Sequence, residues 1–276
     1  MVTDDLSGRE VVIAGSRQDR PNLPVRGCPF CVGGLEAPDP YTVRTFVNRW
    51  PALPDDRAEV VLYTPNHDAT FASLGVAGAG AVIDAWAERS EALGGRADVA
   101  YVLVFENRGA AVGATIGHPH GQIYAFTSVP EAPARELDHP CSLCGHDPGD
   151  RVVSAAGDWQ AYVPEAAEWP YELRVAPRSH VGTLAECDRA GLGGILVDVL
   201  ARLDRLFPPA PMPYMLWVHQ RPSDGGEWPE AHLHVHVAPL LRATGVPRFV
   251  AAGELGSGVY FNPVAPADAA ARLRDA

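Results

Sequence analysis

The 276-residue sequence lacks three kinds of segment that would assign it to particular protein classes. It has no run rich in lysine or arginine, and its formal net charge of -12 argues against nucleic acid as a partner. It has no stretch of eighteen apolar residues, so we expect no transmembrane helix. Its start, MVTDDLSGRE, is acidic and does not resemble a signal peptide. Together these absences predict a cytoplasmic protein that binds neither nucleic acid nor membranes.

Cysteine is also scarce, with five residues, but four of them form two C-x-x-C pairs, CPFC at 28–31 and CSLC at 141–144. In a cytosolic chain such pairs indicate metal or redox chemistry rather than disulfides. A thioredoxin-like pair would open a helix after a strand, whereas both pairs here lie in loops rich in glycine, proline or aspartate, as zinc knuckles do. We expect the fifth, Cys187, to pack as a small apolar side chain.

The cysteine pairs belong to a repeat of metal-ligating residue types. Two cysteines and two histidines are followed, 113 or 114 residues later, by the same residue types. The first set is Cys28, Cys31, His67 and His118, and the second is Cys141, Cys144, His180 and His232. Two thiolates with two imidazoles complete a tetrahedral zinc site and leave no position for water, whereas the alternative is exposed thiols with core histidines. The repeat predicts a duplicated chain with a structural zinc ion in each half.

Hydrophobic patterns also divide the chain into two similar halves. The expected strands lie at 59–65, 101–107 and the His-Pro-His segment in the first half, and at 171–177, 214–220 and 232–239 in the second. A helix separates the first two strands of each half, at 69–93 and in the segment from Leu192 to Leu206, whose apolar residues recur with a 3.6-residue period. The segment 130–140, rich in proline and charge, marks the join.

The segment GATIGHPHGQIYAF contains two histidines, His118 and His120, whose rings would share one face of a strand. If zinc takes His118, His120 is left for chemistry, and a neutral imidazole attacks phosphorus well when its other nitrogen is held by an acceptor. The flanking Gly117 and Gly121 would let the backbone approach a ligand, and Gln122 would offer an amide donor to a phosphate oxygen. The alternative is a histidine that simply packs in the core.

The longer segment FENRGAAVGATIGHPHGQIYAF resembles the active-site segment of the galactose-1-phosphate uridylyltransferase family, a branch of the histidine triad superfamily. The likeness extends over nearly the whole chain, through CPFC, YTPNHDATFASL and HLHVHVAPLLRATGVPRFVAAGELGSG. It implies an α+β fold of two tandem histidine-triad-like repeats, each an antiparallel sheet (a half-barrel) with a packed helix. The halves would be 1–135, which is catalytic, and 136–276, and the chain would form a homodimer.

The resemblance implies a ping-pong reaction at His120. This residue would attack the α-phosphorus of UDP-glucose, and the resulting uridylyl-histidine would pass UMP to galactose 1-phosphate. Gln122 separates this chain from histidine triad hydrolases, which carry a third histidine at that place. The resemblance also implies substrate-binding roles for Arg17, Arg20, Asn48, Trp50, Asn107, Thr115, Arg248 and Glu254. Guanidinium groups suit phosphate oxygens, and an aromatic ring suits a base.

The second half permits a different metal site. In some members of the family that this chain resembles, the positions that correspond to Glu136, His219, His234 and His236 hold the ligands of another metal, often iron. This set would exist beside the second Cys2His2 set or replace it, and the repeat favours zinc. His234 is also an alternative nucleophile, although the sequence before it lacks the G-x-x-x-G-x-[ST] pattern that precedes His120.

Several residues depart from the family pattern. Arg49 stands where an acidic residue that contacts the ribose is common, and Arg248 replaces a usual lysine in a segment that reaches the sugar in the partner subunit. These departures keep nucleotidyl transfer but leave the sugar and the nucleobase open, so an ADP-sugar or another nucleotide sugar is an alternative donor. The remaining alternatives are a nucleotide hydrolase or phosphorylase, and a zinc-stabilised binding protein in which His120 is inert.

Overall fold

The computed structural model describes residues 2–18 and 27–276. Its core is one nine-stranded sheet in the order β3-β4-β6-β5-β10-β11-β9-β8-β7, in which each strand is antiparallel to its neighbours. The strands are β3 Arg44–Val47, β4 Ala58–Leu62, β5 Tyr101–Arg108, β6 His120–Phe126, β7 Val152–Ala156, β8 Trp159–Tyr162, β9 Leu173–Pro177, β10 Tyr214–His219 and β11 His234–Pro239. Two short hairpins add β1 Val2–Thr3 with β2 Glu10–Val11, and β12 Leu241–Ala243 with β13 Val246–Pro247.

The helices are fewer and unequal in length. They are α1 Gly75–Gly94, α2 Glu131–Leu137, α3 Arg189–Leu206, α4 Ala252–Ser257 and α5 Pro266–Asp275, with single 3-10 turns η1 Gly15–Arg17, η2 Ala72–Leu74, η3 Ala110–Val112 and η4 Gly149–Arg151. Within the described ranges, none of these helices combines the length and the apolar character that crossing a membrane requires.

The two halves join edge to edge in the sheet. Strands β4, β6 and β5 of the first half match β9, β11 and β10 of the second, and the halves meet where β5 pairs with β10 from Tyr214 opposite Arg108 to Val218 opposite Val104. The predicted α+β fold with one antiparallel half-sheet per repeat is therefore confirmed. Because β5 and β10 are hydrogen-bonded partners, the two half-sheets form a single continuous surface.

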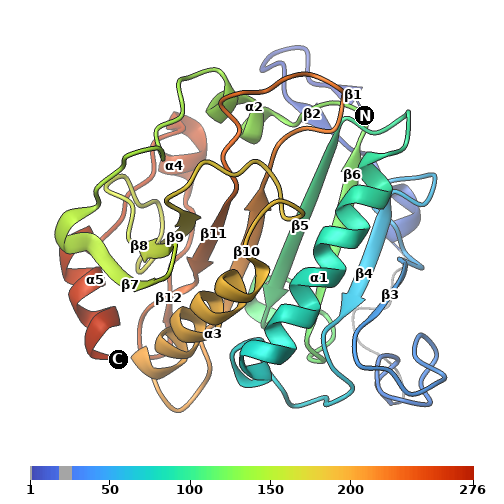
Figure 1. Ribbon diagram of the computed structural model, residues 1–276, viewed down its shortest axis with the longest axis horizontal. Helices are drawn as coiled ribbons and strands as arrows, with labels where there is room; N and C mark the ends of the chain where they lie inside the picture. The colour runs from blue at the N-terminus through green and yellow to red at the C-terminus, as the bar shows by residue number, and fades with distance from the viewer. Residues whose placement is uncertain (1, 19–26) are drawn as a thin grey trace.

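Helices α1 and α3 lie side by side across one face of this sheet (Figure 1). The apolar period read from the sequence is the buried face of α3, and Ile195 and Leu196 there are at most 1% exposed. Gly193 allows the close approach of the two helices, because a Cβ built at this residue would lie 3.2 Å from the backbone nitrogen of Gly80 in α1. Each large apolar side chain buried in this layer contributes about 1.5–3 kcal/mol to folding.

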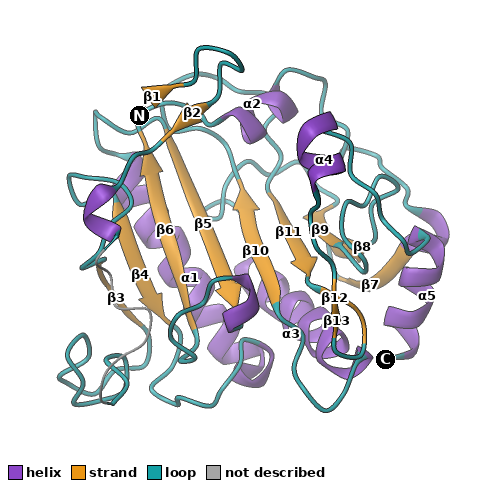
Figure 2. Ribbon diagram, turned by 180° about the vertical axis from the view of Figure 1, so that it is seen from behind, coloured by secondary structure: helices purple, strands orange, loops and turns teal. Residues whose placement is uncertain are grey.

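The opposite face of the sheet is covered unevenly, and this positions the candidate sites (Figure 2). The segment that joins the halves forms helix α2 rather than only a loop, with Pro133 in its first turn, where a missing N–H costs nothing. Strands β6 and β11 begin later than predicted. They begin at His120 and His234, each after the first histidine of its motif. Strands β3, β7 and β8 are too short or too irregular in pattern to have been predicted.

Candidate active site and metal clusters

Strand β6 carries the predicted nucleophile and its neighbour on the sheet face opposite α1 and α3. Residues alternate between the two faces of a strand, so His120 and Gln122 are partly exposed while Gly121 between them is buried. Gly121 has no room for a side chain, since a Cβ there would lie 2.3 Å from the hydroxyl oxygen of Tyr63. Gly121 is therefore required for packing between β6 and Tyr63. At Gly117, by contrast, a Cβ would have no atom within 4 Å.

The ring of His120 is oriented by its own backbone. Its Nδ1 lies 2.7 Å from the carbonyl oxygen of His118, and its ring packs edge-to-face against Phe30 with a centroid separation of 5.1 Å. If Nδ1–H donates to this carbonyl, the neutral imidazole presents Nε2 as its basic nitrogen. This is the tautomer that nucleophilic attack on phosphorus requires.

A cavity of about 670 Å³ opens beside His120, and several predicted substrate-binding residues line it. Asn48 contacts two other residues of the cavity. Its Nδ2 donates to Gln122 Oε1 at 3.4 Å, and its Oδ1 accepts from the Trp50 backbone N–H at 2.9 Å. The first contact occupies the oxygen of Gln122 and leaves its NH2 group to face a ligand. Thr115 lines the same cavity.

The remaining predicted residues of this region lie in different places. Asn107, at the end of β5, lines a smaller cavity of about 50 Å³ that also contains His120. Arg17 donates from Nη1 to the Tyr124 hydroxyl at 3.4 Å, two residues along β6 from Gln122. Arg20 lies outside the described residues.

Arg248 and Glu254 do not line the His120 cavity of their own chain. They form an ion pair with each other, and both are buried. The guanidinium of Arg248 lies 4.5 Å from the ring centroid of Trp169, and Glu254 Oε2 accepts from the Ala251 backbone N–H at 2.9 Å, at the start of α4. Within one chain the pair therefore stabilises the C-terminal segment.

The first Cys2His2 set is assembled as the repeat predicted. The sulfur of Cys31 lies 3.5 Å from His67 Nδ1 and 3.7 Å from His118 Nδ1, and Cys28 Sγ lies 3.8 Å from His118 Nδ1. A tetrahedral zinc ion with bonds of about 2.3 Å to sulfur and about 2.0 Å to nitrogen separates these atoms by about 3.5 Å. The donor set therefore fits zinc.

Contacts behind His118 prepare this ligand for a metal. Its Nε2 lies 2.7 Å from the Thr64 carbonyl oxygen and 3.0 Å from the Tyr41 hydroxyl, which leaves Nδ1 unprotonated on the side of the cysteines. Burial lowers the pKa of His118 and so favours the neutral ring that binds metal. Burial also raises the pKa of Tyr41 to about 12, so its hydroxyl stays protonated.

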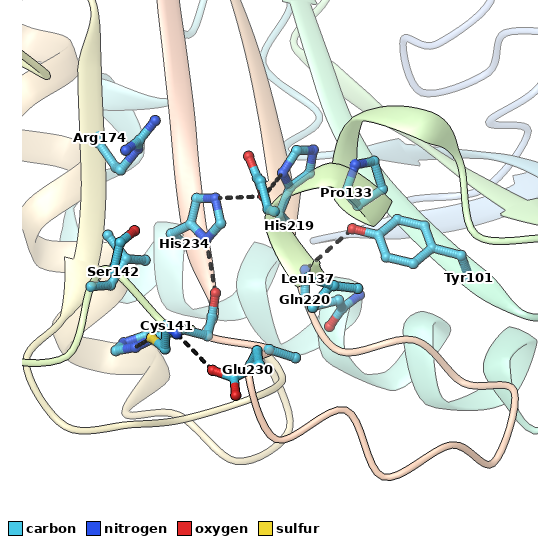
Figure 3. Close-up of a pocket in the computed structure, with 14 residues that line it drawn as sticks. Tyr101, Pro133, Leu137, Cys141, Ser142, Arg174, His219, Gln220, Glu230 and His234 are labelled. Carbon is cyan, nitrogen blue, oxygen red and sulfur yellow. Dashed lines mark hydrogen bonds and ion pairs between the residues drawn. The ribbon is translucent and has the colours of Figure 1, made fainter. Parts of the chain in front are cut away.

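The second Cys2His2 set repeats this arrangement. Its sulfur–nitrogen separations are 3.1 Å for Cys144 with His180, 3.3 Å for Cys141 with His232 and 3.6 Å for Cys144 with His232. His232 Nε2 lies 3.0 Å from the Pro177 carbonyl oxygen, the counterpart of the Thr64 contact. The backbone N–H of Cys141 donates to Glu230, as Figure 3 shows.

The alternative second-half ligands also converge, so the structure assembles this set beside the second Cys2His2 set. Glu136 Oε2 lies 2.7 Å from His219 Nδ1 and 3.3 Å from His234 Nε2, and its Oε1 lies 3.6 Å from His236 Nε2. Figure 3 shows the rings of His219 and His234 turned toward a shared space. His236 Nε2 is buried and, among the described residues, makes no hydrogen bond, as expected of an atom that ligates a metal.

The pKa shifts in this cluster favour protonation states that can bind a metal ion. Burial opposes the ionised form of Glu136, but its contacts with the three histidines outweigh burial and hold the pKa of the carboxyl well below its usual range. Burial lowers the pKa of His219 and of His236, so both rings are neutral at neutral pH. One carboxylate and three imidazoles suit zinc or iron.

Three residues near the first half were not identified from sequence. Phe30 packs on His120, Tyr41 contacts His118, and Glu36 forms an ion pair with Arg49 in the wall of the cavity. None of them belongs to a short motif. Phe30 lies between the two cysteines of the first knuckle, which was the only local signal for its position.

Family models match most of the chain. The model described as galactose-1-phosphate uridyl transferase, N-terminal domain, matches residues 42–130, and the corresponding C-terminal domain matches 140–274. The chain belongs to the galactose-1-phosphate uridylyltransferase family. The Thermotoga maritima galactose-1-phosphate uridylyltransferase is 31% identical to it, over 98% of this chain and 96% of the relative. Family membership makes the chain a transferase.

Solved structures agree with this assignment. A uridylyltransferase structure superposes with a TM-score of 0.89 at 27% identity, covering 99% of this chain and 96% of the other. An Arabidopsis thaliana ADP-glucose phosphorylase with bound ADP-glucose superposes with a TM-score of 0.81 at 26% identity, covering 94% and 93%. The uridylyltransferase fold thus also accommodates an adenine nucleotide in a relative.

Proposed function

We propose that this chain transfers UMP from UDP-glucose to galactose 1-phosphate through a uridylyl-His120 intermediate. The observation that carries the proposal is the contact of His120 Nδ1 with the His118 carbonyl, beside a cavity large enough for a nucleotide. His120 Nε2 forms a bond to the α-phosphorus, the bond from that phosphorus to the bridging oxygen breaks, and glucose 1-phosphate leaves with the electron pair. A phosphate oxygen of galactose 1-phosphate then attacks, and the Nε2–phosphorus bond breaks to return neutral His120.

Neighbouring side chains support each step. The NH2 group of Gln122, fixed by the Asn48 contact to its oxygen, donates to a non-bridging oxygen as charge develops there. Thr115, Asn107 and Arg17 contribute further contacts with the phosphates, and Trp50 packs against the nucleoside. Gln122 has no basic nitrogen that could accept a proton from water, so it does not activate water against the intermediate.

We also propose metal ions in the clusters. Zinc ions at both Cys2His2 sets would fix the knuckle loops to the strands without taking part in transfer. Glu136, His219, His234 and His236 would hold a third ion, zinc or iron, which would fix α2 to the sheet.

We also propose how the chain is divided and how it assembles. The catalytic half is 1–135 and the second half 136–276, and the chain forms a cytoplasmic homodimer. In that dimer, the Arg248–Glu254 segment of one subunit would approach the sugar bound in the other. This arrangement is supported by the absence of both residues from the cavity of their own chain.

The test is the intact mass of the protein after mixing with UDP-glucose, beside a His120→Asn variant. We expect a gain of one uridylyl group that is lost when galactose 1-phosphate is added and that is absent from the variant. A gain that persists with galactose 1-phosphate retains the covalent chemistry but rejects this acceptor. No gain with UDP-glucose rejects the proposal.

A second candidate function is transfer from an ADP-sugar. It is favoured by the likeness to the phosphorylase structure that contains ADP-glucose and by Arg49, whose charge differs from the acidic residue that the family resemblance implied. The same mass measurement with ADP-glucose, followed by inorganic phosphate as acceptor, distinguishes it. An adenylyl adduct that phosphate releases would support this function over uridylyl transfer.

A further inference from the structure

One ion pair in the wall of the His120 cavity has no part in the transfer chemistry. Among the described residues that line the cavity, Glu36 supplies the only carboxylate and Arg49 the only guanidinium. Arg49 Nε donates to Glu36 Oε1 at 2.6 Å. The side chain of Glu36 is 16% exposed and that of Arg49 is 51% exposed, so the carboxylate lies deeper in the wall than its partner.

The backbone of Glu36 is fixed by the first knuckle on its N–H side and by strand β3 on its carbonyl side. Its N–H donates to the Pro29 carbonyl at 3.0 Å, and its carbonyl accepts from Arg44 Nε at 2.7 Å. The next residue, Ala37, is fully buried and closes the loop by donating to the Gly34 carbonyl at 3.2 Å. The position of the carboxylate is therefore set before any ligand binds.

Only one of the two carboxylate oxygens is used within the chain. Oε1 accepts from Arg49, while Oε2 makes no hydrogen bond with any residue that the structure describes. A carboxylate in a nucleotide cavity is suited to accept hydrogen bonds from the hydroxyl groups of a ribose. Asn48, another polar residue of the wall, is already engaged with Gln122 and Trp50.

We propose that Glu36 recognises the ribose hydroxyls of the bound nucleotide and that Arg49 is its positioning residue. This inference rests on the proposed function, because it takes the cavity beside His120 as the nucleotide site. The pair also explains the arginine at position 49, whose guanidinium orients the carboxylate instead of opposing it. Glu36 would make the enzyme select ribonucleotides over 2′-deoxyribonucleotides, whichever base the cavity accepts.

The size of the selection follows from a charged hydrogen bond. A 2′-deoxy ligand excludes water from the carboxylate but offers no hydroxyl in exchange, which weakens binding by about 10- to 100-fold. Glu36→Ala removes the acceptor, so both ligands should then bind within about threefold of each other. Glu36→Gln retains the shape of the side chain and should reduce the selectivity less.

The experiment is calorimetric titration of UMP and 2′-deoxy-UMP into the full-length protein and its variants. Asp39→Ala is the matched control, since Asp39 is an exposed carboxylate of the same loop. We expect the ratio of the two dissociation constants to be unchanged in the control and lost in Glu36→Ala. Arg49→Ala should give an intermediate ratio, because the carboxylate remains but is less well oriented. Unfolding midpoints identify any variant that fails to fold, in which case Glu36→Gln decides.

The outcomes separate this inference from the proposed function. A wild-type protein that does not distinguish the two ligands, or a Glu36→Ala variant that still does, overturns the role of Glu36 even if UDP-glucose yields the uridylyl adduct. Absence of the adduct in the wild type, while UMP still binds with the expected selectivity, overturns the transfer reaction and leaves the ribose site. Failure of the wild type to bind either nucleotide overturns both.

Discussion

The second histidine of each His-x-His motif occupies a matching position in the two halves, and the same local backbone orients both rings. His120 Nδ1 lies 2.7 Å from the His118 carbonyl, and His234 Nδ1 lies 2.7 Å from the His232 carbonyl. In each half the first histidine contacts a cysteine pair, which anchors the strand start. The repeated motif thus presents Nε2 on the same sheet face twice.

What packs on that face then decides the chemistry. In the first half, Nε2 of His120 belongs to the wall of a cavity of about 670 Å³. In the second half, helix α2 brings Glu136 to 3.3 Å from His234 Nε2, and His236 stacks on Trp217 at a centroid distance of 4.7 Å. The comparison teaches that one strand motif can line an open cavity or meet a carboxylate in a closed cluster, depending on the covering element.

The strongest test of this comparison exchanges the two equivalent histidines for asparagine. His120→Asn should abolish the uridylyl adduct and reduce transfer by about 10⁴-fold or more, because no nucleophile remains. His234→Asn should retain the adduct but lose one metal ion per chain. Intact mass and elemental analysis measure both results. An adduct in His120→Asn, or its loss in a folded His234→Asn, would contradict the division of roles.

A reciprocal exchange sharpens the comparison at the next position along each strand. Gln122→His makes the first half resemble the second, and we expect transfer to galactose 1-phosphate to fall by about 10- to 100-fold while UMP is released to water. His236→Gln is the matched control, and it should leave transfer largely intact while weakening the metal cluster. Chromatography of the nucleotide products measures the partition. If Gln122→His transfers UMP as well as the wild type, the amide is not the feature that protects the intermediate.

The two Cys2His2 sites should differ in what their loss affects. Cys28→Ser and Cys141→Ser should each remove one zinc ion and lower the unfolding midpoint by about 5–10 °C. Only Cys28→Ser should also weaken UMP binding, by about tenfold, because the first knuckle carries Phe30 and Glu36. Cys187→Ala tests for effects of cysteine removal alone and should retain all metal. Equal affinity of the two serine variants for UMP would contradict this difference between the sites.

The smallest effect concerns the buried carboxyl of Glu106 in the first half. Glu106 in β5 accepts from the Tyr214 hydroxyl at 2.9 Å, and burial raises its pKa from 4.5 to about 7. Between these values the folded chain keeps a proton that the unfolded chain has lost, so stability falls as pH rises from about 4.5 to about 7 and then stops changing on this account.

Glu106→Gln should remove this dependence, which is at most about 1.4 kcal/mol per pH unit. Urea unfolding of the wild type and the variant at pH values on both sides of the window measures it. Val218 in the neighbouring strand β10 is fully buried, so Val218→Ala is a packing control that should retain the slope. An unchanged slope in Glu106→Gln would assign the dependence to another group.

Local patterns were sufficient for helices α1 and α3, for strands β4, β5, β6, β9, β10 and β11, and for the grouping of the candidate metal ligands. The 3.6-residue period of α3 appears in the structure as its buried face, and the offset of 113 or 114 residues between ligand types corresponds to two assembled Cys2His2 clusters. Helix α2 was not predicted, because its seven residues contain a proline and too few apolar positions to show a period. The role of Gly121 also differs from the one predicted. It leaves room for the Tyr63 hydroxyl, which belongs to a segment distant in the sequence, rather than for a ligand.

By itself the sequence predicted the duplication and the Cys2His2 sets, through residue types at repeated spacings, and its resemblance to the family implied the antiparallel α+β fold and the roles proposed for His120 and Gln122. Only the tertiary structure showed that the Glu136 cluster forms beside the second Cys2His2 set and that Glu36 meets Arg49 in the cavity wall. Both depend on contacts between segments whose separation along the chain follows no period. Packing across the sheet face decides such contacts, and no local spacing encodes them.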